Sequence, residues 1–269
     1  MSDGLVYLMY HELELPTRAL CESEPGYVRY VVGAEDFRQQ LSHLQSNNFR
    51  GLCVGEALAL ADAERPASSS ENRPTVVITF DDGCETDLLV AAPLLQQLSF
   101  KATFYVTVAH LDQRGYLSKG QLRELSELGF EIGSHSMTHS LLSDLASDRL
   151  HVEIAGSKSR LEELIGKSVV HFSCPGGRWD QRVARIAREA GYDSVVTSSI
   201  GVNPQAPDRF RLSRVPVMRG MKIEDFERIC RAEGLGLRRA QGAVLDAAKR
   251  VLGNSIYQRL RSTVLGQGA

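Results

Sequence analysis

The sequence lacks a long hydrophobic run, an excess of charge of one sign and any closely spaced pair of cysteines. Its 269 residues include 31 Lys and Arg against 33 Asp and Glu, which leaves a formal net charge of -2. That balance excludes nucleic acid or an anionic membrane as the main partner of the whole chain. The apolar runs, such as Thr75 to Phe80, are far shorter than the ~20 residues of a transmembrane helix. We therefore expect a protein that does not cross a membrane and recognises its ligand locally.

The chain also lacks two signals of export. The first residues contain Asp3 and reach only from Leu5 to Met9 before the polar pair His11 and Glu12. They have neither the basic region nor the long apolar region of a signal peptide. The five cysteines are scattered and form no C-x-x-C motif, which favours reduced thiols over a disulfide framework. These absences predict a cytoplasmic protein.

What the sequence does contain is 43% hydrophobic residues, arranged as short β-branched stretches that alternate with amphipathic ones. This alternation is typical of an α/β fold with a largely parallel sheet. The predicted strands are Leu5 to Tyr10, Thr75 to Phe80, Ala102 to Val106, Phe130 to Gly133, Val169 to Ser173, Ser194 to Thr197 and Leu212 to Val217. Helices are predicted around Leu41, Leu125, Leu161 and Ile186, and from Pro93 to about Leu98. About seven such units predict a (β/α) barrel, complete or incomplete.

Two segments fall outside this alternation. The polar segment 61–74, rich in serine, is expected to be a flexible loop within one barrel domain that spans 1–235. Segment 236–269 carries six basic residues and one acidic residue, Asp246, with apolar residues near helical spacing. We expect amphipathic helices with a basic outer face there, which either dock onto the barrel or contact a membrane surface or a partner.

Two adjacent carboxylates, Asp81 and Asp82, follow the predicted strand Thr75 to Phe80. Barrels of the α/β class build their active sites at the carboxyl ends of such strands. Asp-Asp-Gly is also a common turn sequence, so these two residues alone do not define a site.

Two histidines, His135 and His139, follow the predicted strand Phe130 to Gly133. One helical turn would bring both onto one face, and the two aspartates are expected at the same end of the barrel. An isolated H-x-x-x-H is often a surface pair. Two imidazoles and one carboxylate, however, form a set that binds Zn²⁺ or a similar divalent ion and leaves positions open for water and substrate. The conjunction predicts a metal site, with the second carboxylate free to act as a base.

These residues resemble the polysaccharide deacetylase family, also called the NodB homology domain or carbohydrate esterase family 4. The sequence Thr79 to Gly83, TFDDG, is similar to the first motif of that family, and His135 to His139, HSMTH, is similar to the second, H-[ST]-x-x-H. The resemblance covers roughly Val76 to Val217, and it implies a deformed (β/α) barrel.

The resemblance also implies roles for single residues. It makes Asp81 the catalytic base, and it makes Asp82, His135 and His139 the metal ligands. The implied cofactor is a divalent metal ion, with Zn²⁺ as the expected one.

The third motif departs from the family pattern. Where most members have R-x-P-[YFW]-G, this chain has SCPGG from Ser173 to Gly177. Arg214 or Arg178 is then expected to orient the base, because a guanidinium reaches a carboxylate from a neighbouring strand. Each of the two is alternatively a solvated surface residue. The backbone N–H of Gly176 remains available to stabilise an oxyanion, and the glycines are expected to widen the cleft.

The late histidine that supplies the general acid in most members is also absent, since no histidine follows His171. His11, however, ends the first predicted strand in the sequence Met9-Tyr10-His11. This sequence resembles a circularly rearranged branch of the family, typified by deacetylases of poly-N-acetylglucosamine, in which the acid comes from an N-terminal strand. The resemblance implies that His11 is the general acid. The alternative is a strand-end histidine with no catalytic role.

Other side chains near the motifs have simpler interpretations. Cys84 and Cys174 are expected to be packed thiols, and Trp179 either stacks on a sugar at the cleft rim or packs against the next helix. Three further histidines are expected at ordinary surface positions: His43, His110 and His151.

The residues and the resemblance together predict a metal-dependent hydrolase that removes acetyl groups from N-acetylated sugars. The expected partner is an acetylated sugar or a glycan precursor, and the cytoplasmic expectation favours a lipid-linked or nucleotide-linked one. Two alternatives remain open. In the first, the same metal site serves an O-acetyl esterase or a non-sugar amidase. In the second, the chain is a catalytically weak carbohydrate-binding protein of a glycan-assembly complex. Segment 236–269 is the expected surface for contact with such a complex or with a membrane.

Overall fold

One curved sheet forms the centre of the molecule. The computed structural model describes residues 4–63 and 73–236, and its main sheet contains nine strands. They are β1 (Gly4–Tyr10), β4 (Arg50–Leu52), β5 (Thr75–Phe80), β6 (Thr103–Val106), β7 (Glu131–Ser134), β8 (His171–Ser173), β9 (Ser194–Val196), β10 (Asn203–Pro204) and β11 (Val215–Pro216). A separate two-stranded sheet pairs β2 (Leu13–Glu14) with β3 (Val32–Gly33).

The strand order curls this sheet into a barrel. It runs β10-β1-β5-β6-β7-β8-β9, with β4 beside β5 and β11 beside β1. Every pair is parallel except β1 with β10. A bridge joins Val196 of β9 to Leu212, and Val215 then pairs with Leu8 of β1. One short segment therefore connects the last strand to the first, which gives the deformed (β/α) barrel that was predicted.

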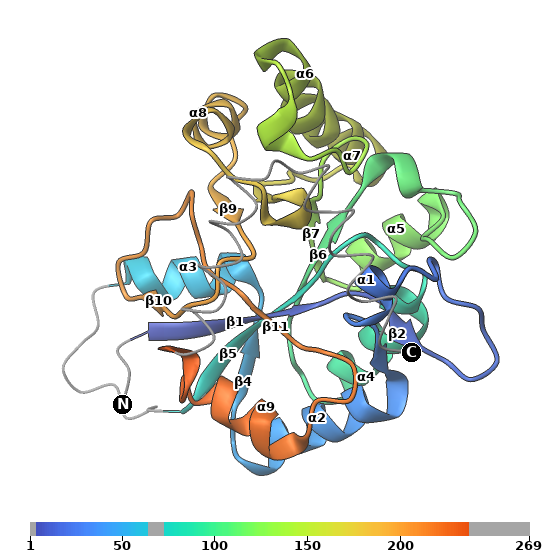
Figure 1. The fold of residues 1–269 in the computed structure, drawn as a ribbon, viewed down its shortest axis with the longest axis vertical. Coiled ribbons are helices and arrows are strands. Elements are labelled where there is room, and N and C mark those ends of the chain that lie inside the picture. The colour runs from blue at the N-terminus through green and yellow to red at the C-terminus, as the bar shows by residue number, and fades with distance from the viewer. Residues whose placement is uncertain (1–3, 64–72, 237–269) are drawn as a thin grey trace.

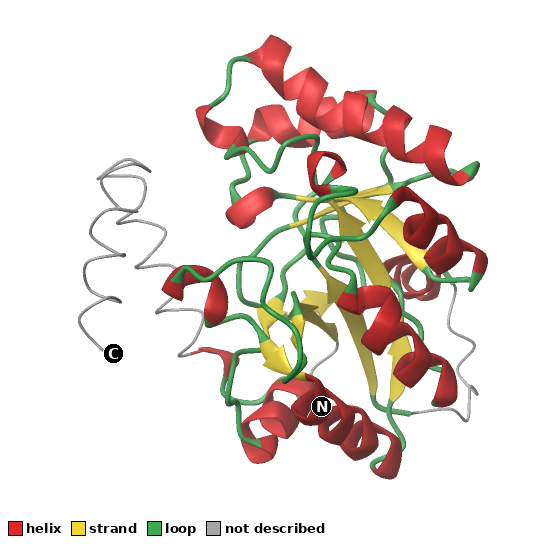
Figure 2. Ribbon diagram, turned by 90° about the vertical axis from the view of Figure 1, so that its right-hand side faces the viewer, coloured by secondary structure: helices red, strands yellow, loops and turns green. Residues whose placement is uncertain are grey.

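Most of the helices lie outside the sheet, and α3 (Val54–Asp62) lies at one end of the barrel (Figures 1 and 2). The helices are α1 (Pro25–Val28), α2 (Ala34–Ser46), α3, α4 (Ala92–Gln97), α5 (Lys119–Glu127), α6 (Ser147–His151), α7 (Ser157–Ile165), α8 (Gln181–Glu189) and α9 (Ile223–Cys230). A π-helical turn, Asp87–Ala91, leads into α4, and a second one, Val152–Gly156, joins α6 to α7.

Local sequence fixes where several helices begin and end. The Ser118 hydroxyl accepts a hydrogen bond from the backbone of Gln121, whose side chain bonds back, so α5 starts with a capping box. The Asp180 carboxylate accepts hydrogen bonds from two backbone N–H groups at the start of α8. Helix α7 ends at Gly166, which has a φ of 67° that favours glycine.

The strands divide the apolar side chains into an outer and an inner layer. Ile78 and Phe80 of β5 belong to the outer core with the helices, whereas Val77 of the same strand contacts an inner cluster with Tyr7 and Tyr105. Successive strand residues point to opposite faces, so this division follows from the period of two. Helix α3 contributes to the inner cluster.

Helix α3 lies at the amino end of the barrel. Gly55 in its first turn donates its N–H to the Glu131 carboxylate at the start of β7. Apolar side chains of α3 therefore fill the amino end of the barrel interior, and the carboxyl end is left to polar side chains.

Most of the predicted elements are confirmed. Each of the seven predicted strands overlaps a strand of the structure, although the last shrinks to the two residues of β11. Strands β2, β3, β4 and β10 were not predicted, because two or three residues are too few to show an alternation.

Parts of the domain prediction fall outside the described residues. The predicted loop 61–74 overlaps the end of α3, and its residues 64–72 are not among those described. The predicted helical extension 236–269 is described only at its first position. Among the described residues, no helix has both the length and the apolar character that crossing a membrane requires.

Candidate active site

The predicted site residues lie at the carboxyl ends of the strands, on the inner face of the barrel. Val77 points inward, so the period of two also directs Thr79 and Asp81 inward. Tyr7 points inward, and the same period carries through β1 to His11, just beyond its end. Two segments far apart in the sequence therefore direct polar side chains into one space.

Asp81 and Arg214 form a buried ion pair with two parallel hydrogen bonds. Arg214 Nη1 donates to Asp81 Oδ1, and Nη2 donates to Oδ2, each at 2.7 Å. The Ser173 hydroxyl donates to Oδ1 at 3.2 Å and accepts from Arg214 Nη2 at 2.9 Å. The guanidinium also donates to the Thr197 carbonyl and the Thr79 hydroxyl. The pair is thus fixed on all sides, as a buried bidentate contact requires.

This surrounding keeps Asp81 ionised. Burial by itself raises the pKa of the Asp81 carboxyl, but the Arg214 charge, the His135 charge and the hydrogen bonds from Arg214 outweigh it and lower the pKa. Among the described residues, a single donor, Arg214 Nη2, bonds to Asp81 Oδ2. Oδ2 therefore retains a lone pair with which to accept a proton.

Of the two arginines predicted as candidates, Arg214 is the one in contact with Asp81. Ser173 stands where most of the family has arginine, and it bonds to both members of the pair. Gly176 lies in a 3₁₀ turn, Pro175–Gly177, with a φ of 58°. A Cβ added at Gly176 would lie 3.3 Å from Leu141 Cδ2, so the conformation and the space both favour glycine there.

Asp82, His135 and His139 converge on one point, as predicted. Asp82 Oδ1 lies 3.5 Å from His135 Nε2 and 3.3 Å from His139 Nε2, and the two rings are 5.0 Å apart. Their ligand atoms all lie within 4.8 Å of one another. The convergence is not that of a helical turn. Asp82 and His139 have φ values of 79° and 61°, so a tight loop presents them.

The hydrogen bonds of this group fit a metal ion better than a proton. His135 Nδ1 lies 2.9 Å from the Ser173 carbonyl oxygen, which only accepts, so Nδ1 carries the proton of a neutral ring. Burial lowers the pKa of His135 to about 4 and favours that neutral ring. The unprotonated Nε2 then faces Asp82 Oδ1, a buried atom without a hydrogen-bond partner among the described residues. Two facing lone pairs repel each other unless a cation lies between them.

Electrostatics keep Asp82 ionised as well. Burial raises the pKa of the Asp82 carboxyl, but the contact with His139 and the charges of the three nearby histidines bring it below its usual range. His139 is the more exposed ring, and despite partial burial its pKa is raised by the contact with Asp82.

His11 lies beside both aspartates. Its ring stacks on Tyr30, with centroids 5.0 Å apart and an angle of 30° between the planes. The charge of a protonated His11 lowers the pKa of Asp81 and of Asp82, although it is not the largest cause acting on either carboxyl. His11 Nδ1 is buried and has no hydrogen-bond partner among the described residues. His11 therefore acts electrostatically on both aspartates, and its role as the general acid stays a prediction.

His110 was predicted as a surface residue, and the structure corrects this. Its ring lies 5.7 Å from that of His139 and 4.3 Å from that of Tyr116, and burial lowers its pKa. No motif pointed to it, because it lies in a short 3₁₀ turn, Val108–His110, after β6. The signal available was its position just beyond a strand end.

Trp179 is partly buried and packs against the segment that precedes β11. Its indole N–H donates to the Phe210 carbonyl at 2.7 Å, and the Arg211 guanidinium lies over its ring at 4.8 Å. The ring also contacts the outer core. These contacts are with Phe210 and Arg211 and not with residues of the next helix, α8, which the packing alternative named.

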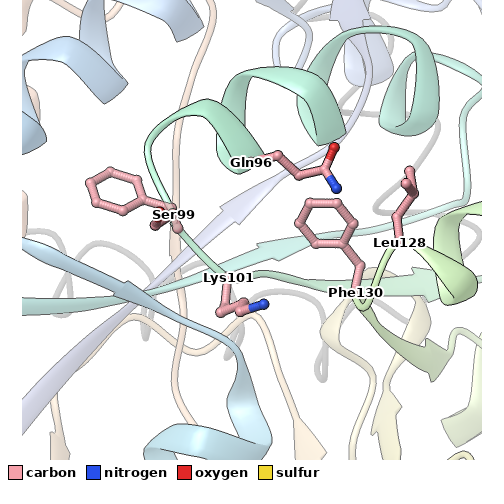
Figure 3. Close-up of a pocket in the computed structure, with 6 residues that line it drawn as sticks. Gln96, Ser99, Lys101, Leu128 and Phe130 are labelled. Atoms are coloured by element: carbon pink, nitrogen blue, oxygen red, sulfur yellow. The ribbon is translucent and has the colours of Figure 1, made fainter.

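A hollow of about 250 Å³ lies at the other end of the barrel (Figure 3). It is lined by Gln96, Ser99, Phe100, Lys101, Leu128 and Phe130. These residues precede β6 and β7, so the hollow opens at the amino ends of the strands. The ion pair and the Asp82 group lie at the carboxyl ends, and the hollow is no part of them.

Comparisons with known proteins point to one family. Residues 68–195 match the family model described as polysaccharide deacetylase. The Bacillus subtilis protein YxkH, provisionally assigned as a polysaccharide deacetylase, is 28% identical over 82% of this chain and 74% of its own length. The peptidoglycan-N-acetylglucosamine deacetylase of Bacillus cereus is 34% identical over 47% of this chain and 58% of that protein.

A solved structure has the same fold. The deacetylase PplD of Streptococcus pyogenes, determined with acetate, superposes with a TM-score of 0.72 over 86% of this chain and 99% of that chain, at 24% identity. This likeness supports the deformed barrel fold.

Proposed function

We propose that this chain, which is similar to polysaccharide deacetylases, is a member of that family. In this proposal it hydrolyses the acetamide of an N-acetylated sugar with a divalent metal ion held by Asp82, His135 and His139. The proposal rests on two buried atoms, Asp82 Oδ1 and His135 Nε2, which lie 3.5 Å apart and direct lone pairs toward each other. Two imidazoles and a carboxylate suit Zn²⁺ and leave positions open. When bound, such an ion polarises a carbonyl and lowers the pKa of a water molecule.

Asp81 acts as the base. Its Oδ2 keeps a free lone pair and lies 4.0 Å from His135 Nε2, so it faces the point where Asp82 and the histidines converge. Arg214 and Ser173 hold the carboxylate in one orientation and ionised, which prepares it to take a proton from the attacking water. Arg214 positions Asp81 and does not itself reach the substrate, because its side chain is fully buried.

His11 and Gly176 complete the reaction. The carbonyl oxygen becomes an oxyanion as water attacks, and the N–H of Gly176 is the backbone donor assigned to it. His11, in the electrostatic field of the two aspartates, gives a proton to the departing amine, which leaves slowly as an anion. Acetate and a free amino sugar are the products.

The substrate class follows from the relatives. One of them is named as a deacetylase of peptidoglycan N-acetylglucosamine, which supports an N-acetylhexosamine as the unit recognised. A panel of N-acetylglucosamine oligomers, nucleotide-linked and lipid-linked N-acetyl sugars and O-acetylated sugars separates polymer, precursor and ester substrates by acetate release.

The decisive experiment combines that assay with metal analysis of the Asp81→Asn variant. We expect the variant to keep its metal, since Asp81 is no ligand, and to lose activity by a factor of about 10² or more. Loss of metal in Asp81→Asn would show that the roles of the two aspartates are exchanged. A wild-type protein that binds a divalent ion and releases no acetate from any member of the panel would contradict the proposed function.

A further inference from the structure

A second group of reactive side chains lies beside the candidate site, where the loop 15–31 meets the residues that follow β5. It contains Cys21 and Cys84, whose sulfur atoms are 3.6 Å apart, together with Glu12. Cys84 is fully buried and Cys21 is partly exposed. Both are free thiols in the structure. The two cysteines are far apart in the sequence, and the fold alone brings them into contact.

The carboxylate in this group is already committed. Glu12 is buried and accepts hydrogen bonds from the Cys21 N–H at 2.9 Å, the Tyr27 hydroxyl at 2.9 Å and Arg18 at 3.2 Å. These bonds anchor the loop to the end of β1. Because Glu12 is occupied in this way, the group offers two sulfur atoms in contact rather than a third open ligand for a metal ion.

Each thiol takes part in weak hydrogen bonds with neighbouring described residues. The Cys21 thiol donates to the Gly115 carbonyl at 3.0 Å, and Cys84 lies 3.5 Å from the Tyr27 hydroxyl. To form a disulfide, the two sulfur atoms must approach to a bond length of ~2.05 Å. The loop that carries Cys21 is better able to move than the strand end that precedes Cys84.

We propose that Cys21 and Cys84 are an oxidative modification site, which a hydroperoxide converts into a disulfide that ties the loop 15–31 to the peptide following Asp82. The Cys21 sulfur attacks the peroxide, the O–O bond breaks, water leaves and a sulfenic acid forms on Cys21. The Cys84 sulfur then attacks that sulfur, the S–O bond breaks, and the oxygen leaves as water with the Cys84 proton. Two thiols are oxidised by two electrons, and one hydrogen peroxide is reduced to two waters.

The tether would reach the candidate site from two directions. Cys84 is separated from Asp82 by one residue. The loop carries Tyr30, which stacks on His11, and Glu22, which accepts a hydrogen bond from Tyr116. The disulfide would therefore hold the loop beside His11 in a single position.

The test uses the purified full chain treated with limiting hydrogen peroxide, blocked with an alkylating agent and digested without reduction. Mass spectrometry should find the Cys21 and Cys84 peptides linked, with two of the five thiols lost and restored by dithiothreitol. The oxidised protein should melt about 5 °C or more higher, and amide exchange in 15–31 should slow.

Two variants make the test specific. Cys21→Ser removes a partly exposed thiol, is expected to fold and should abolish the link. Cys230→Ala changes a buried cysteine of α9 and should leave the link intact. Oxidation that stops at a sulfinic acid on Cys21, a link to another cysteine, or a link that leaves exchange in 15–31 unchanged would overturn the proposal. These readouts do not depend on acetate release, so they stand apart from the fate of the proposed function.

Discussion

Two clusters of carboxylate and histidine lie at opposite ends of the barrel. At the amino ends, Glu131 begins β7 and His171 begins β8, with His171 Nε2 3.4 Å from the Glu131 carboxylate. At the carboxyl ends, Asp82 lies beside His135 and His139. Glu131 and Asp82 both have a lowered pKa, because in each case neighbouring charges and hydrogen bonds outweigh the effect of burial. The direction of the pKa shift therefore does not distinguish the two clusters.

Hydrogen bonding does distinguish them. Glu131 accepts hydrogen bonds from the Gly55 N–H and the Thr103 hydroxyl, and His171 Nδ1 bonds to the Ser194 hydroxyl. At the other end, Asp82 Oδ1, His11 Nδ1 and His110 Nδ1 are buried without a partner among the described residues. Buried polar groups are usually satisfied within the protein. The amino-end cluster therefore holds strands together, and the carboxyl-end cluster is built for something that the chain itself does not supply.

The largest effect should come from removing Asp82, one of the three proposed metal ligands. Asp82→Ala takes away the carboxylate on which both histidines converge, so we expect loss of the bound divalent ion and a fall in kcat/KM on the order of 10³ or more. Metal content by mass spectrometry and acetate release measure the two effects. Removal of the ion from wild type by a chelator should have the same consequence, and re-addition should restore activity to wild type but not to the variant.

Glu131→Gln is the control for that experiment, since it also alters an ionised carboxylate beside a histidine. The control should keep its metal. If Glu131→Gln loses the ion as readily as Asp82→Ala, the distinction between a satisfied and an unsatisfied cluster fails.

The next effect concerns His11. His11→Ala should lower kcat on an acetamide substrate by a factor on the order of 10², because the departing amine then lacks its proton donor. An activated acetyl ester, whose leaving group needs no proton, should be affected far less. Equal losses on the two substrates would indicate that His11 positions or binds the substrate instead.

A smaller effect on activity and a larger one on stability should follow from changing Arg214. Arg214→Met leaves Asp81 buried without its cation, which should cost about 3–5 kcal/mol of unfolding free energy. Replacing both partners, as in Asp81→Asn with Arg214→Met, should recover most of that loss. Urea unfolding of the two single variants and the double variant measures the coupling. Additive losses would mean that the pair seen in the structure contributes no interaction of its own.

These residues also show how far the sequence alone could lead. Asp81, Asp82, His135 and His139 were predictable because each follows a strand whose β-branched run is evident, and parallel strands end at one edge. Arg214 remained one of two candidates, since it precedes a strand of two residues and is placed only by the closure of the barrel onto β1. Ser173, His110 and Tyr30 were not assigned to the site, because contacts between loops far apart in the chain leave no periodic pattern.

The smallest effect on activity should come from the amino-end cluster, and its signature should be a dependence of stability on pH. Burial raises the pKa of Glu131, but the hydrogen bond and charge of His171, with the bonds from Thr103 and Gly55, lower it overall. The folded pKa lies below the unfolded one, so the ionised carboxylate stabilises the fold above the unfolded value of about 4.3. That contribution is lost as pH falls through the lowered folded pKa. Glu131→Gln should therefore cost about 1–3 kcal/mol near pH 7, the difference from wild type should shrink below about pH 4, and kcat should stay within about twofold. A stability difference that does not change with pH would show that the ionised carboxylate of Glu131 adds nothing beyond its shape.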